Sequence, residues 1–167
     1  HRLPRPRCMT TRMAPEFITF HVDFPSDTGP HPHTNPGVRE YHAMVDLFFR
    51  SARLFHSDAV LTLLTNASTA FEGITLPFGC RQAEVAEQTV MLDRARAQLR
   101  HIEASDFRRP LVFADSDVLV NGSLEALWKR DFDVALTWRS DQTMPINGGL
   151  IIVNNRRPSA SVAFFQG

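Results

Sequence analysis

The 167-residue sequence contains only two cysteines, Cys8 and Cys80, which lie far apart and form no Cys-x-x-Cys pair. We therefore expect neither a disulfide scaffold nor a cysteine-rich zinc site. No apolar stretch approaches the roughly 20 residues that a membrane-spanning helix needs. The formal net charge is zero, because 18 Lys and Arg residues balance 18 Asp and Glu residues. The composition thus gives no electrostatic reason to expect nucleic acid or an anionic membrane as a partner.

Length and composition indicate one globular domain. Hydrophobic residues make up 43% and charged residues 22% of the chain, which is typical of folded soluble proteins. The N-terminal segment HRLPRPRCMTTR is rich in Arg and Pro and lacks the apolar region of a secretory signal. We expect residues 1–15 to be a disordered or non-native extension and residues 16–167 to form the domain. The expected location is the cytoplasm or the periphery of a membrane.

Hydrophobic periodicity predicts alternating strands and helices. Alternation of apolar and polar residues or short apolar runs indicate strands, and apolar residues at helical spacing indicate helices. The expected strands are residues 17–24, 59–65, 111–114, 134–137 and 150–153, and the expected helices are residues 38–55, 82–102, 123–128 and 159–167. This order predicts an α/β fold with a Rossmann-like, mostly parallel central sheet flanked by helices. Trp138, Phe164 and Phe165 are expected in the core.

Polar residues lie at the carboxyl ends of three of the predicted strands, where ligands bind in such sheets. They are Asp23, Thr65-Asn66 and Asp115-Ser116-Asp117. The last group is the strongest signal, because a buried run delivers two carboxylates that repel one another and resist desolvation. A divalent cation relieves both problems, and Mg²⁺ typically takes one or two protein carboxylates while substrate phosphates fill its other positions. The alternative is an Asp pair that only caps the following turn.

The run LVFADSDVLV, residues 111–120, resembles the DxD motif of GT-A-fold glycosyltransferases, in which an apolar strand ends in Asp-x-Asp. Arg94, the strand FDVALTWR (132–139) and the turn PINGGL (145–150) match the same family in the expected order. Family 8 and related sugar-nucleotide transferases are the nearest comparison, over about residues 16–167. The resemblance implies an incomplete GT-A-like nucleotide-sugar-binding domain. It also implies transfer from a nucleotide diphosphate sugar, expected to be a UDP-sugar, to a glycan, lipid or protein acceptor, with Mn²⁺ or Mg²⁺ as cofactor.

The resemblance also implies roles for individual residues. Asp117 would hold the metal against the diphosphate, and Asp115 would bind ribose or sugar hydroxyls and contribute to the metal. Arg94 would neutralise phosphate charge or pair with Asp115, the alternative being a surface helix arginine. Asn147 would contact a sugar hydroxyl. The other expected donor-binding residues are Phe20, Val22, Asp23, Asn66, Ser116, Gly148 and Gly149.

One departure from the family concerns the metal. Many of these enzymes take a further ligand, often His, from a segment near the C-terminus, whereas no His follows His101 here. We therefore expect the C-terminal part of the domain to be missing, and weak donor binding with slow or no turnover by this chain. His31-Pro32-His33 could bind a metal, but a solvent-exposed Pro-rich loop is the more common role of such a segment.

Three rival functions share part of this pattern. A phosphatase of the haloacid dehalogenase type also has D-x-D after an apolar strand, with the first Asp as nucleophile, but it uses a catalytic lysine, and Lys129 is the only lysine. A nucleotidyltransferase of similar fold would have a Gly-rich phosphate loop after the first strand, where Phe24-Pro25-Ser26 stands. The third rival is a non-catalytic sugar-nucleotide-binding module.

Overall fold

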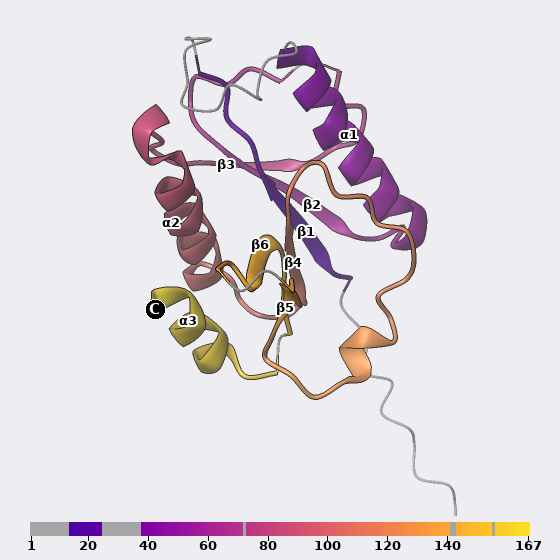
Figure 1. The fold of residues 1–167 in the computed structure, drawn as a ribbon. Helices are drawn as coiled ribbons and strands as arrows, with labels where there is room; N and C mark the ends of the chain where they lie inside the picture. The colour runs from indigo at the N-terminus through magenta and orange to yellow at the C-terminus, as the bar shows by residue number, and fades with distance from the viewer. Residues whose placement is uncertain (1–13, 25–37, 72, 141–142, 155) are drawn as a thin grey trace, which may run out of the picture.

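The computed structural model describes residues 14–24, 38–71, 73–140, 143–154 and 156–167. Its strands form one six-stranded sheet in the order β3-β2-β1-β4-β6-β5 (Figure 1). The strands are β1 (Glu16–Phe20), β2 (Val60–Thr65), β3 (Gly79–Gln82), β4 (Leu111–Ala114), β5 (Val134–Trp138) and β6 (Ile146–Val153). The helices are α1 (Val38–Phe55), α2 (Val90–Glu103) and α3 (Pro158–Gln166), with short 3₁₀ turns η1 (Glu87–Thr89) and η2 (Leu127–Lys129). None of the described helices is both long enough and apolar enough to cross a membrane.

The sheet is parallel on one side and antiparallel on the other. Strands β3, β2, β1 and β4 pair in parallel, and β6 runs antiparallel to both β4 and β5. Parallel neighbours need long crossover connections, and α1 lies in the connection from β1 to β2 and α2 in that from β3 to β4. The predicted mostly parallel α/β fold is confirmed. The reversal at β6 is a long-range pairing that the local sequence pattern does not encode.

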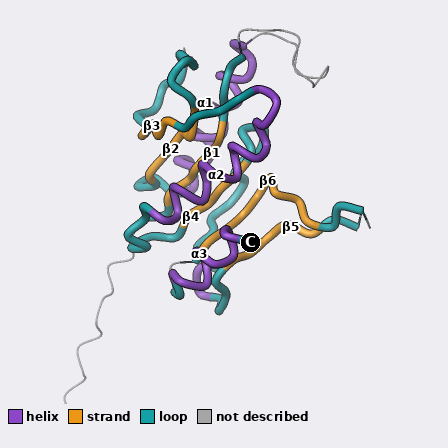
Figure 2. Tube along the Cα trace, turned by 90° about the vertical axis from the view of Figure 1, so that its left-hand side faces the viewer, coloured by secondary structure: helices purple, strands orange, loops and turns teal. Residues whose placement is uncertain are grey.

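Helices cover both faces of the sheet. Helix α1 packs on one face, while α2 and α3 pack on the other (Figures 1 and 2). Strand β1 is buried on both faces. Phe17 belongs to the core under α1 and its neighbour Ile18 to the core under α2, and neither residue has exposed surface. Strands buried on both faces read as near-continuous apolar runs, and those runs allowed β2 and β4 to be predicted.

Two predicted helices are wrong in part. The helix expected over 82–102 begins only at Val90, and Gly79–Gln82 forms the edge strand β3. All four residues of β3 are exposed, so the strand has no apolar alternation by which to predict it. The helix expected over 123–128 is replaced by the 3₁₀ turn η2. The Oγ of Ser123 accepts a hydrogen bond from the backbone N of Glu125, two residues on, at 3.2 Å, which closes a local turn instead of capping a helix.

Three smaller predictions also differ from the structure. The strand expected over 17–24 ends at Phe20, because the chain beyond it turns toward the side chains of α1 and the loop after β2. Trp138 is not in the core, since 74% of its surface is exposed at the end of the β5–β6 pair. Phe164 is 44% exposed, whereas Phe165 packs against the core under α2.

A half-buried, hydrogen-bonded carboxylate at the amino end of β1 makes stability dependent on pH. Glu16 accepts hydrogen bonds from the Thr62 hydroxyl at 2.6 Å and from the His101 ring at 3.2 Å. Burial alone would raise the pKa of Glu16, but the bonds from His101 and Thr62 outweigh it, and the pKa lies below 4.5, the ordinary value. A lowered folded-state pKa stabilises the fold above the unfolded-state pKa, and this contribution is lost as the pH falls through the folded value.

We expect Glu16→Gln to lower the free energy of unfolding by about 1–3 kcal/mol near neutral pH, because a half-buried, hydrogen-bonded carboxylate is replaced. The difference from the wild type should begin to shrink as the pH falls below about 4.5, where the unfolded chain binds the proton, and should be lost once the pH passes the lower pKa of Glu16 in the folded chain. Urea unfolding curves across this pH range measure the effect. The exposed Glu84 supplies the matched control, Glu84→Gln, and an equal loss in both variants would contradict the prediction.

Candidate functional site

The polar residues predicted at the strand ends lie along one edge of the sheet. Asp23 follows β1, Asn66 follows β2 and Asp115 follows β4. These three strands are parallel neighbours, with Phe20 opposite Leu64 and Thr19 opposite Ala114. Their carboxyl ends therefore meet at the same edge, which is where ligands bind in open α/β sheets.

Asp115 is the centre of one polar cluster at this edge. The guanidinium of Arg94, on α2, contacts the Asp115 carboxylate at 2.5 Å and also donates to the backbone oxygen of Gly148 at 3.1 Å. The backbone N of Asp115 donates to the oxygen of Gly149 at 2.8 Å. The backbone N of Gly149 in turn donates to the Asn147 side chain at 2.9 Å. The structure thus brings five of the sequence-predicted site residues into one network.

The pairing of β4 with β6 explains this arrangement. Ala114 lies opposite Leu150 in the antiparallel register, so the next residue of one strand meets the preceding residue of the other. A Cβ atom at Gly149 would lie 2.5 Å from Oδ2 of Asp115 and 3.1 Å from the Asn147 side-chain oxygen. A side chain at position 149 would therefore displace the Asp115 carboxylate from its present position beside Arg94.

Arg94 is not a free surface arginine. Its side chain is only 16% exposed, and it joins α2 to both β4 and β6 through the contacts with Asp115 and Gly148. The Asp115 side chain keeps 38% of its surface exposed. One side of the carboxylate is therefore held by the protein, and the other remains open to a ligand.

Asp117 and Ser116 lie in the turn that leaves β4. The backbone N of Val118 donates to the oxygen of Asp115 at 3.2 Å and closes this turn, with Asp117 exposed and Ser116 half-buried. Carboxylate oxygens are the ligands that Mg²⁺ and Mn²⁺ prefer, so the two aspartates fit such an ion chemically. Within the described residues, no third His, Cys, Asp or Glu completes a ligand group with them.

A second polar cluster faces α1. The Nε2 atoms of His21 and His42 each lie 3.0 Å from a different oxygen of the Asp23 carboxylate. The ring of His21 stacks on Tyr41, and Phe71 packs against both imidazoles. Burial lowers the pKa of His21, and the contact with Asp23 offsets this only in part. The described part of the chain holds no other group of three side chains arranged to surround a metal ion.

Asn66 reaches this second cluster through Thr69. The Asn66 side-chain oxygen accepts bonds from the backbone N of Thr69 at 2.9 Å and from its hydroxyl at 2.6 Å. The Thr69 hydroxyl oxygen then accepts a bond from the backbone N of Asp23 at 2.8 Å. Asn66 therefore orients the Asp23 loop. Phe20 packs partly buried against the core under α2, and Val22 is half-buried.

The two clusters lie on opposite faces of the sheet. Asp115 contacts Arg94 of α2, whereas His21 contacts Tyr41 and His42 of α1. Sequence reasoning missed the second cluster. The spacing His21-x-Asp23 at a strand end is the one local signal for it, because His42 belongs to a helix that only the folded chain brings close.

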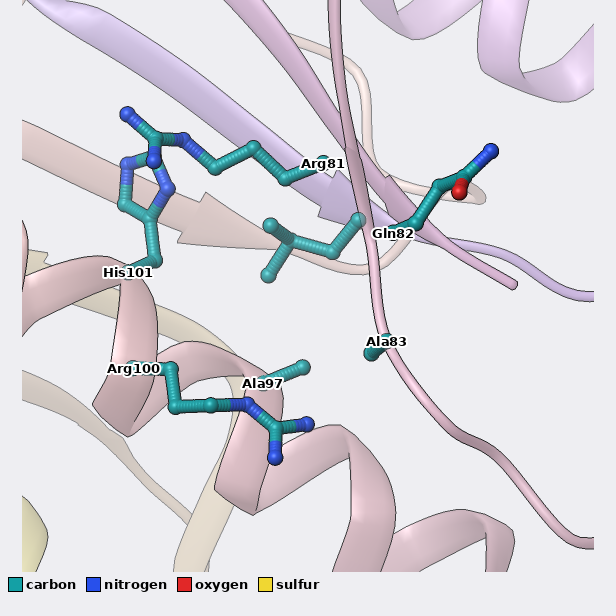
Figure 3. A pocket seen from close by; sticks show the side chains of 7 residues that line it. Arg81, Gln82, Ala83, Ala97, Arg100 and His101 are labelled. Atoms are coloured by element: carbon teal, nitrogen blue, oxygen red, sulfur yellow. The ribbon is translucent and has the colours of Figure 1, made fainter. Parts of the chain in front are cut away.

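Two cavities among the described residues lie away from both polar clusters. One cavity of about 310 Å³ lies between the end of β3 and α2. Figure 3 shows three of the side chains that line this cavity, Arg81 from β3 and Arg100 and His101 from α2. Another of about 470 Å³ opens beside Glu16 and Arg109. Neither includes a residue of the two polar clusters. The candidate role of the carboxyl edge therefore rests on its side chains.

The order and pairing of the strands give a mixed α/β sheet, and solved glycosyltransferase structures have a similar fold. The chain is similar to the apo form of the glycosyltransferase GlyE of Streptococcus pneumoniae TIGR4, with 14% identity and a TM-score of 0.52 over 93% of this chain and 37% of that one. It is also similar to an active-site mutant of LgtC, with 15% identity and a TM-score of 0.50 over 84% of this chain and 57% of that one. A galactosyltransferase LgtC complex with donor and acceptor sugar analogs gives 16% identity and a TM-score of 0.49 over 90% and 65% of the two chains.

These similarities concern the fold. Neither a protein-family model nor a curated protein matches the sequence significantly. The chain spans between about a third and two thirds of the length of the structures it resembles. The similarity to GT-A-fold glycosyltransferases predicted from the sequence is thus confirmed for the fold, and the activity is a separate inference.

Proposed function

We propose that this chain forms the nucleotide-sugar-binding part of a metal-dependent glycosyltransferase whose donor is a UDP-sugar. The observation that carries the proposal is the position of Asp115. Its carboxylate lies at the carboxyl end of β4 in a GT-A-like sheet. It contacts the Arg94 guanidinium and lies close to the Cα of Gly149. The same edge of the sheet is the ligand-binding edge of open α/β folds. The acceptor would be a glycan, lipid or protein.

The two aspartates would have separate tasks. Asp115 shares its carboxylate with Arg94, and its open side would accept hydrogen bonds from ribose or sugar hydroxyls. Asp117, exposed in the turn, would be the principal ligand of Mn²⁺ or Mg²⁺, with Asp115 beside it. An ion held there would supply Lewis-acid stabilisation for the negative charge of a departing diphosphate.

The neighbouring residues would position the donor. Asn147 holds the backbone of Gly149 at 2.9 Å, and its amide group would contact a sugar hydroxyl. Gly148 and Gly149 allow the donor to approach the backbone closely. Phe20, Val22 and Ser116 would contribute to the donor site, and Asn66 would act through the loop that carries Asp23.

The rival functions are distinguishable at the same site. A haloacid dehalogenase-type phosphatase uses a lysine with its nucleophilic aspartate, whereas the cation that contacts Asp115 here is Arg94. This observation favours a transferase over that phosphatase. A non-catalytic sugar-nucleotide-binding module would use the same carboxylates for binding alone.

The experiment is to incubate the chain with a panel of UDP-sugars and Mn²⁺ and to measure UDP release and UDP binding. We expect weak, Mn²⁺-dependent UDP binding, with slow or no release of UDP from the donors. Hydrolysis of p-nitrophenyl phosphate without UDP binding would contradict the proposal and select the phosphatase. Tight UDP binding without any release, in a chain extended at its C-terminus, would select the binding module.

A further inference from the structure

We propose that His21, Asp23 and His42 form a second metal site, which binds a divalent transition-metal cation of the Zn²⁺ class. The ligand atoms of these three side chains all lie within 4.8 Å of one another. The two Nε2 atoms lie 3.0 Å from separate Asp23 oxygens. Ligand atoms around a tetrahedral ion with bonds of about 2.0 Å are roughly 3.3 Å apart. Small side-chain shifts would therefore suffice to enclose an ion.

The donor set selects the kind of metal. Two imidazole nitrogens and one carboxylate oxygen suit Zn²⁺ and the neighbouring first-row cations, whereas Mg²⁺ prefers oxygen ligands alone. The second site should therefore differ in metal preference from the Asp115 and Asp117 pair. Three protein ligands also leave a fourth position open to water or to a ligand group.

The surroundings resemble those of built metal sites. The His42 and His21 side chains are only 3% and 12% exposed, and Tyr41 and Phe71 pack against their rings. The Thr69 hydroxyl holds the backbone of Asp23 at 2.8 Å, and Asn66 holds Thr69. These bonds fix the backbone of the loop that carries the Asp23 carboxylate.

A cation at this site would join two elements of the fold. His21 and Asp23 follow β1, and His42 belongs to α1. Asp115, by contrast, contacts α2 on the opposite face of the sheet. Binding to the folded chain alone stabilises it by mass action. The inference goes beyond the proposed glycosyl transfer and does not depend on it, because it requires neither a donor nor turnover.

The test is calorimetric titration of the metal-free full chain with Zn²⁺ alone, together with thermal unfolding. We expect one tightly bound ion and a higher unfolding temperature. His21→Gln and His42→Gln should each weaken Zn²⁺ binding by about 100-fold or more, beyond the 10–100-fold cost of losing an outer-shell partner, and should abolish the thermal shift. Two controls should keep the wild-type affinity: Asp117→Ala, and His31→Gln combined with His33→Gln, whose positions lie outside the described residues.

The visible absorption of Co²⁺ bound to the wild-type chain provides a second test, which does not require a histidine variant to fold. Wild-type chain loaded with Co²⁺ should show the intense visible bands of a four-coordinate site with nitrogen ligands, and Zn²⁺ should remove them. A weak spectrum typical of the hydrated ion would overturn the proposal and leave a metal-free hydrogen-bonded cluster. Equal Zn²⁺ affinity in folded His21→Gln would overturn it as well, and loss of binding in the His31 and His33 double variant would place the ion there instead.

Discussion

Asp117→Ala is expected to reduce Mn²⁺ affinity and the rate of UDP release from a UDP-sugar by about 100-fold or more. Loss of even an outer-shell partner of a metal costs about 10–100-fold, and Asp117 is proposed as the principal ligand itself. The side chain is exposed in the turn after β4, so its removal should leave the fold intact. Mn²⁺ titration followed by electron paramagnetic resonance, together with a UDP-release assay, measures both effects.

The matched control is Asp58→Ala. Asp58 is also an exposed turn aspartate, but it lies just before β2, at the opposite edge of the sheet. Removing its charge changes the net charge of the chain in the same way without touching the site. The prediction is contradicted if Asp117→Ala keeps wild-type Mn²⁺ affinity, or if both variants lose the same amount.

Gly149→Ala is expected to destabilise the fold by about 1–3 kcal/mol, the usual range for forcing extra volume into a packed site. The new Cβ would stand 2.5 Å from Asp115 Oδ2 and 3.1 Å from the Asn147 oxygen. The carboxylate must therefore move away from its position beside Arg94. Because Asp115 is proposed to bind the donor, UDP affinity should fall by about 10-fold, which corresponds to about 1.4 kcal/mol.

Gly148→Ala separates this effect from the general consequence of replacing a strand glycine. Gly148 neighbours Gly149 in β6, but a Cβ there would meet no atom within 4 Å. We expect its stability to equal or slightly exceed that of the wild type, because alanine loses less conformational entropy on folding. Urea unfolding of the two variants makes the comparison. Equal stability of the two variants would contradict the prediction, because it would show that a Cβ at residue 149 does not disturb the Asp115 carboxylate.

Much of the sheet could be predicted because its central strands are buried on both faces. Residues 59–65 and 111–114 are short apolar runs, and both correspond closely to strands, β2 and β4. The amphipathic stripe of α1 was equally clear, and the helix covers residues 38–55 as expected. The exposed edge strand β3 carries no such pattern. The antiparallel position of β6 was not predictable either, because pairing direction depends on where distant segments dock.

The same distinction applies to the candidate site. Asp115 and Asp117 were predicted because a single local run carries both the strand and its terminal carboxylates. The contact of Asp115 with Gly149 depends on the β4–β6 register, and that of His42 with Asp23 on how α1 packs beside β1. Neither juxtaposition is visible in one segment of sequence. Asn66 was predicted to bind the donor, which stays a prediction, and its link to Asp23 through Thr69 appears only in the folded chain.

The proposed role of the metal is tested most directly by calorimetric titration of the wild-type chain with UDP. One titration contains Mn²⁺, and in the other the metal is removed by a chelator. If a cation on the β4 carboxylates bridges protein and diphosphate, Mn²⁺ should tighten UDP binding by about 10-fold or more, and UDP should tighten Mn²⁺ binding by the same factor. Equal UDP affinity with and without the metal would contradict it.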